Sequence, residues 1–177
     1  MKKPVVVIIT LLLTSSVYGQ NADIKVMVDS LPFIKSDTLD CSAALYWKII
    51  AQGEKAIPFL IDKLTDTTQT LVRFHCKQTT LNAGEVAQFA LTEIAFLPEF
   101  YITKVQFDFI GVDKTGQGCW SFYDFLFINS NKSFYQTKIR EWYAREKGKF
   151  RMQYIAEKHK TSCQRLYGID KYYNWVR

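Results

Sequence analysis

The alternation of apolar and polar residues predicts helices over much of the chain. Between residues 41 and 52, apolar side chains recur at helical spacing, and Asp40 and Gly53 stand at the two ends as an N-cap and a C-cap. The next stretch, EKAIPFLIDKLTD, carries a second apolar stripe and has Pro58 early enough to occupy a first helical turn. Because only a few residues connect the two stretches, we expect an antiparallel helix pair.

This pair resembles a HEAT repeat, within residues 41–97. The similarity rests on Ala56, Ile57, Pro58, Leu60, Leu64 and Asp66 for a helix and its turn, and on Val72 and Arg73 for the start of a second helix. The resemblance implies helix pairs that stack into a superhelix, whose concave face commonly binds other proteins. The chain has no second copy, and stacking normally takes at least three units. We therefore expect one HEAT-like element inside a compact domain.

Later segments give fewer clear helices. The stretch EVAQFALTEIAFL has an apolar helical face, whereas residues 101–110 fit either a strand or a helix, with the preceding Pro-Glu pair favouring the helix. Residues 111–118 read as a glycine-rich loop, residues 133–148 as an amphipathic helix, and the alternation of Phe150, Met152 and Tyr154 as a short strand. The predicted fold class is mainly α: a compact helical domain with a HEAT-like antiparallel pair and at most one short strand pair.

The N-terminal residues have the pattern of a secretory signal peptide. Lys2 and Lys3 precede an apolar run from Val5 to Leu13, and small residues follow up to Gly19. The run is too short to span a bilayer, which takes about 20 residues. We predict a signal peptide at residues 1–19, a single domain at residues 20–177, no transmembrane segment after cleavage, and a periplasmic or secreted location.

Export changes how the cysteines are interpreted. Cys41, Cys76, Cys119 and Cys163 are expected to form two disulfides, because an exported protein folds in an oxidising compartment. Four cysteines permit three pairings. An antiparallel helix pair would return the chain from Asp66 towards Cys41, with Cys76 in the loop just after, so we predict Cys41–Cys76 and, by elimination, Cys119–Cys163.

Cys119 also has a second interpretation. Residues 117–122, QGCWSF, resemble the papain-type signature, and the resemblance implies a small secreted hydrolase with Cys119 as its nucleophile. That family places its histidine more than a hundred residues after the cysteine, whereas the chain offers only His159 downstream. The histidines and cysteines also lack the spacing of a structural zinc site. We predict no catalytic residue, no metal and no cofactor.

The C-terminal quarter is basic. Residues 138–177 contain eleven Lys or Arg and four Asp or Glu, interleaved with aromatic residues, a composition suited to anionic partners. The predicted binding surface consists of Lys138, Arg140, Arg145, Lys147, Lys149 and Arg151. Outside the cytoplasm, we expect a protein or an anionic envelope component as partner and no nucleic acid. The leading hypothesis is an exported, non-enzymatic helical binding or scaffold module, and the alternatives are the Cys119 hydrolase and an inhibitor or immunity-type protein.

Overall fold

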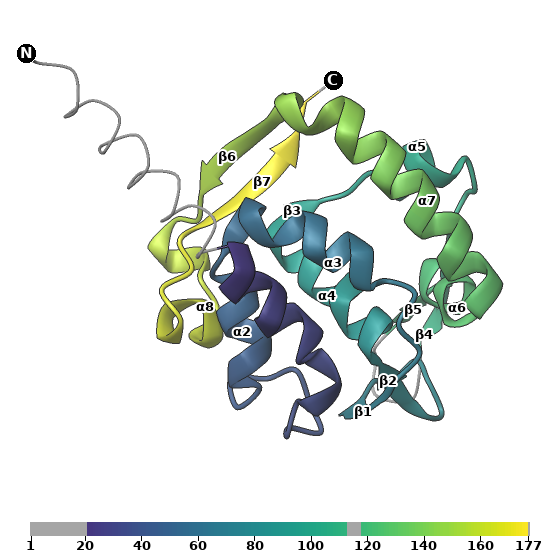
Figure 1. The fold of residues 1–177 in the computed structure, drawn as a ribbon, viewed down its shortest axis with the longest axis horizontal. Coiled ribbons are helices and arrows are strands. Elements are labelled where there is room, and N and C mark those ends of the chain that lie inside the picture. Colours follow the sequence, from purple (N-terminus) through teal and green to yellow (C-terminus); the bar gives the residue numbers. More distant parts are fainter. Residues whose placement is uncertain (1–20, 113–117, 177) are drawn as a thin grey trace, which may run out of the picture.

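The structure, a computed structural model, describes residues 21–112 and 118–176 (Figure 1). The predicted signal peptide lies outside the described residues, as do residues 113–117 of the predicted loop. Residues 21–29 are helical. The further α-helices are α2 (Ala44–Ile50), α3 (Ile57–Lys63), α4 (Ala83–Ile94), α5 (Glu99–Thr103), α6 (Ser121–Phe127), α7 (Asn129–Glu146) and α8 (Ser162–Leu166). No helix in this part of the chain is long and apolar enough to cross a membrane.

Helix α4 occupies the middle of the molecule. Nine of its 12 residues are buried, and its sequence, AGEVAQFALTEI, is accordingly small or apolar on most sides. Helices α2 and α3 pack against α4, and α7 packs against α3 (Figure 1). The buried apolar side chains of these helices belong to one hydrophobic cluster, which also includes residues of the segments before α2 and after α7.

The start of α4 lies directly against the end of α3. A side chain on Gly84 would bring its Cβ to 2.1 Å from the carbonyl oxygen of Leu64, so this approach requires glycine. The Gly84 amide donates a hydrogen bond of 2.9 Å to the carbonyl of Asp66. The two helices are therefore joined backbone to backbone.

An ion cluster of Glu85, Lys77 and Lys132 fixes the same end of α4. Asn82 and Glu85 form a capping box, in which each side chain binds the backbone amide of the other residue. The Glu85 carboxylate also accepts hydrogen bonds from Lys132 Nζ at 2.8 Å and from Lys77 Nζ at 2.6 Å. The side chains of Glu85 and Lys132 are 0% and 1% exposed, so each depends on the other for charge compensation.

Within the described residues, seven strands form three small sheets. Strands β1 (Gln69–Arg73) and β2 (Thr80–Asn82) are antiparallel, as are β4 (Phe109–Val112) and β5 (Gly118–Trp120). The third sheet contains β3 (Ala95–Phe96), β7 (Lys171–Trp175) and β6 (Phe150–Tyr154) in that order. Strand β7 lies in the middle, parallel to β3 and antiparallel to β6.

The prediction of a mainly α fold is wrong, because the structure is mixed α/β. Val72 and Arg73, which the HEAT resemblance assigns to the start of a second helix, lie in β1. Burial along β1 alternates residue by residue, which is the period of a strand with one buried face. The HEAT resemblance itself stays a prediction.

Other segments agree more closely with their patterns. Helix α7 confirms the amphipathic helix predicted at residues 133–148 and extends it at its start, and β6 confirms the short strand. The ambiguous stretch 101–110 divides between the end of α5 and the start of β4. The tail after residue 161 forms α8 and β7. Because β7 pairs with both β3 and β6, the single short strand pair expected from the sequence is part of a three-stranded sheet.

Candidate functional site

An open cleft of about 630 Å³ lies where α5, β5 and the end of β7 meet, and we call it the aromatic cleft. Six aromatic side chains line it: Phe96, Phe100, Tyr101, Phe107, Trp120 and Trp175. Its other lining residues are Pro98, Glu99 and Gln106. This volume lies in the range typical of sites for small organic ligands, roughly 300–1,000 Å³.

The rim of the aromatic cleft is unusually apolar for a surface. Phe96 is 66% exposed, Phe100 51% and Tyr101 37%. Single exposed apolar residues are common on proteins, but exposed apolar residues gathered at the mouth of a cleft indicate an interaction site.

One wall of the cleft carries Trp120 and Phe107, whose ring centres are 6.1 Å apart. Ser121 fixes this wall, because its hydroxyl accepts a hydrogen bond of 2.7 Å from the Asp108 amide and its own amide donates to the Asp108 carbonyl at 2.9 Å. These two bonds tie the segment carrying Phe107 to the start of α6. The wall is thus held by backbone contacts from two segments.

A second pair of rings that line the cleft, Trp175 and Tyr101, has its ring centres 5.9 Å apart. The Trp175 indole N–H donates to the Glu146 carboxylate at 3.4 Å. Hydrogen bonds from Lys149 and Arg145 lower the pKa of Glu146 to about 2, so this acceptor is ionised under ordinary conditions. Lys149 and Arg145 therefore keep Glu146 charged, and Glu146 in turn orients the Trp175 ring of the cleft.

Among the described lining residues of the cleft, Glu99 is the one that carries a carboxyl group. Only 8% of the residue is exposed, and no described cation lies within ion-pair distance of it. Burial raises the pKa of Glu99 to about 7, partly opposed by a hydrogen bond from its own backbone. A carboxyl group with such a pKa, in a cleft, is a reasonable candidate for a functional residue.

Two further polar side chains, those of Tyr135 and Gln88, are buried in the same part of the chain's core. The Tyr135 hydroxyl and the Gln88 amide are fully buried, and neither makes a hydrogen bond of standard geometry to a described residue. Burial and then the charge of Glu99 raise the pKa of Tyr135, whereas the nearby Gln88 side chain lowers it. Buried polar groups without a well-formed hydrogen bond are rare, and one of these two, Tyr135, interacts with the Glu99 carboxyl group.

The structure bonds all four cysteines into two disulfides, but the predicted pairing is wrong. Cys41 pairs with Cys163, and Cys76 pairs with Cys119. The hairpin β1–β2 carries Cys76 away from the helices and towards β5, whereas α8 lies beside the start of α2, where the Tyr167 hydroxyl also donates to the Cys41 carbonyl at 2.9 Å. Disulfides persist in oxidising compartments, so both bridges indicate folding outside the reducing cytosol.

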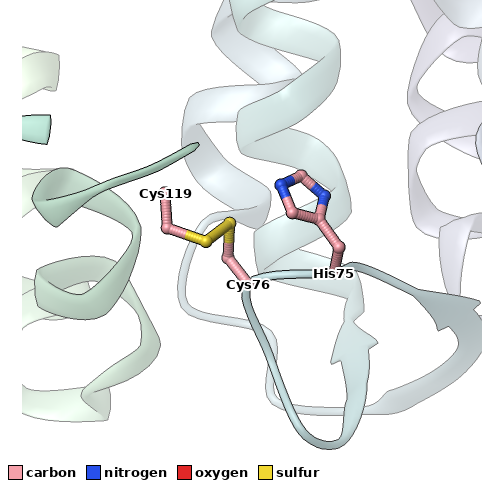
Figure 2. A group of neighbouring side chains, drawn as sticks. All are labelled: His75, Cys76 and Cys119. Atoms are coloured by element: carbon pink, nitrogen blue, oxygen red, sulfur yellow. A yellow bond between two sulfur atoms is a disulfide. The ribbon is translucent and has the colours of Figure 1, made fainter. Parts of the chain in front are cut away.

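His75 lies beside the Cys76–Cys119 disulfide, as Figure 2 shows. The ligand atoms of these three residues all lie within 4.8 Å of one another. While the two sulfur atoms are bonded to each other they are not thiolates, so in this state the group is not a set of metal ligands and Cys119 is not a nucleophile. His75 is instead placed to influence how the disulfide opens.

We predict that Cys76–Cys119 is reduced faster than Cys41–Cys163 under limiting dithiol. An imidazole N–H next to the sulfur atoms stabilises the departing thiolate, and within the described residues no histidine forms such a group with Cys41 and Cys163. Alkylation and peptide mapping during partial reduction would give the order of opening. His75→Ala should slow the first step by about threefold or more, and early opening of Cys41–Cys163 would contradict the assignment.

The six basic residues predicted as a binding surface follow one another along α7, the turn after it and β6. Four of them form ion pairs with acids of the same chain: Lys138 with Glu141, Arg140 with Asp62, and Arg145 and Lys149 with Glu146. Arg151 donates to the carbonyls of Gly148 and Phe150, and Lys147 is exposed in the turn. Much of the charge is therefore matched locally, and the role of this surface stays a prediction.

Comparison of the chain with models of protein families, with curated proteins and with solved structures finds no match. The aromatic cleft is therefore interpreted from its own geometry. The sequence does not predict this site, because its residues extend from position 96 to position 175 without a motif. The high aromatic content, 15%, is the only signal in the sequence that points towards it.

Proposed function

We propose that the protein is an exported, non-enzymatic binding module that holds a small organic ligand, or an organic group of a larger partner, in the aromatic cleft. One observation carries the proposal: six aromatic side chains and one nearly buried carboxyl group converge on an open cleft of about 630 Å³. Aromatic walls supply apolar contact area, and the carboxyl group supplies a polar contact that orients the ligand.

Export is the part of the proposal that rests on the disulfides and on the signal-like N-terminal sequence. Both bridges join segments that are distant in sequence, with separations of 122 and 43 residues. Restricting such long loops in the unfolded chain typically stabilises the folded state by about 2–4 kcal/mol for each bridge. A binding module that works in an oxidising compartment benefits from this stability without needing a larger core.

The alternatives from the sequence have less support. A hydrolase that uses Cys119 requires a thiol, whereas this cysteine is bonded to Cys76. An anionic envelope component would bind the basic residues, yet most of these are paired with acids of their own chain. No feature of the described residues favours an inhibitor or immunity-type protein over the binding module.

The proposal predicts that cleft substitutions weaken the binding of small aromatic compounds. We would titrate benzyl alcohol into the mature protein and follow the signals of the tryptophan indoles by NMR. Trp120→Ala and Phe100→Ala should each weaken binding by about fivefold or more, because each removes a ring from the cleft. Tyr154→Ala, which removes a 69% exposed ring on β6, is the matched control.

An unchanged affinity in both cleft variants, with the fold intact by circular dichroism, would refute the site. Equal weakening by Tyr154→Ala would show that the probe binds exposed rings generally and would also contradict the proposal.

A further inference from the structure

The described lining of the aromatic cleft carries formal charge of one sign only. Among the described residues, Glu99 is the only formally charged one in the lining, and this described lining contains no Lys, Arg or His. This differs from the rest of the protein, which has 23 Lys or Arg and 17 Asp or Glu. A ligand that fills the cleft therefore meets one negative charge and no positive charge among the described lining residues.

The aromatic walls favour the same sign of ligand charge. The faces of Trp, Tyr and Phe rings are electronegative, and cations bind over them at centroid distances up to about 6 Å. The molecule already uses this contact at the rim, where Lys104 Nζ lies 5.4 Å from the centre of the Tyr101 ring. Trp120 and Trp175, the ring type with the strongest attraction for cations, both line the cleft.

We infer that the ligand of the aromatic cleft is an organic cation, such as a quaternary ammonium or alkylammonium group, held between the Glu99 carboxylate and the aromatic rings. This inference rests on the proposed function and names the ligand class of the same site. A neutral ligand would leave the carboxylate buried without compensation, whereas a cation supplies the charge partner that no described residue provides.

Lys104 is the nearest competing cation that the contacts reveal. It lines the neighbouring depression together with Lys138 and Arg145, and it touches Tyr101 from there rather than entering the cleft. A ligand with an anionic group would favour that basic depression. A preference for cationic ligands therefore indicates the aromatic cleft, whereas a preference for anionic ligands indicates the basic depression.

A charge series on one aromatic ring tests the inference. Benzyltrimethylammonium, benzyl alcohol and phenylacetate share a benzyl group and carry charges of +1, 0 and −1. We would measure each dissociation constant at pH 8 by the NMR titration described above, using the mature protein with both disulfides formed. The expected result is that the cation binds at least about tenfold more tightly than the alcohol and that phenylacetate binds most weakly.

Glu99→Gln should remove most of the difference between cation and alcohol, because glutamine keeps the shape of the side chain and loses the charge. Glu93→Gln is the matched control, since it makes the same change of charge in a residue that lines a different depression. The control should leave the cation's affinity within about twofold of the original.

Affinity for the cation should also decrease as the pH is lowered. Glu99 has a pKa of about 7, so affinity should be about tenfold or more weaker at pH 5.5 than at pH 8. Tyr123 and Tyr135 also interact with Glu99, and burial raises the pKa of both further above 10, so neither titrates in this range. The other charged group facing this part of the cleft is Lys104, whose Nζ lies over the Tyr101 ring at the rim.

The outcomes separate this inference from the proposed function. If benzyl alcohol binds as tightly as the cation and cleft substitutions weaken both, the cleft is a binding site but the cation inference is overturned. Tightest binding of phenylacetate overturns it in favour of the basic depression. If none of the three compounds binds, both the inference and the proposed function fail.

Discussion

Replacement of Glu85 by glutamine is expected to lower the free energy of unfolding by about 3–5 kcal/mol. Glutamine preserves the size of the side chain and can still contact Asn82, but it removes the charge that compensates Lys132. That lysine is 1% exposed, and its other polar contact among the described residues is the Asn129 side chain at 3.4 Å. A buried ammonium group without a counter-charge is far more costly than the loss of an exposed ion pair.

Urea unfolding at pH 7 would measure this effect, and the double variant Glu85→Gln/Lys132→Met supplies the control. Removing both charges should recover a large part of the lost stability, because no unpaired charge stays buried. Lys77→Met removes a partner that is 16% exposed and should cost less than Glu85→Gln. A loss below about 1 kcal/mol in Glu85→Gln would show that the ion cluster contributes little to the fold.

Glu99→Gln is expected to make the protein more stable at alkaline pH. Burial raises the pKa of Glu99 from the reference value of 4.5 to about 7. Between these values the folded state binds more protons than the unfolded state, so stability of the unmodified protein falls as pH rises from about 4.5 to 7 and then levels off. The glutamine side chain does not titrate and is free of this penalty.

Relative to the unmodified protein, the variant should gain about 2–3 kcal/mol between pH 5 and pH 8, since each unit of pKa shift corresponds to about 1.4 kcal/mol. Urea unfolding at several pH values would measure this gain. Glu141→Gln alters a carboxylate that is 61% exposed and serves as the charge-matched control. Parallel pH profiles for Glu99→Gln and the unmodified protein would show that the Glu99 carboxyl group is solvated and would also remove a premise of the cation inference.

The helices could be predicted from the sequence where an apolar stripe runs over several turns. Helix α7 is such a case, because Tyr135, Ile139 and Trp142 recur on one buried side. The strands were largely missed because most are short, and a strand of two to five residues gives too few alternations to establish a period. In β3 and β7 the partner strand, rather than a local pattern, determines the conformation.

The candidate site could not be predicted for a related reason. Glu99 lies in a five-residue helix with no motif around it, and its burial depends on how α6 and α7 pack. The disulfide pairing failed because the segment between Asp66 and Cys76, expected to leave Cys76 in a loop near Cys41, contains strand β1, which carries the chain towards β5. Both results depend on contacts between segments that are distant in sequence.

The order of strands in the three-stranded sheet has a consequence for synthesis. Strand β7 follows β3 and β6 along the chain but lies between them in space. On a nascent chain, β3 and β6 therefore have no neighbour in this sheet until residues 171–175 have emerged, and the wall formed by Trp175 is missing. Early folding would leave two unpaired strand edges open to association with other chains. A chain held unfolded until its synthesis has passed β7 avoids this hazard, which makes the topology well matched to a protein that folds only after translocation.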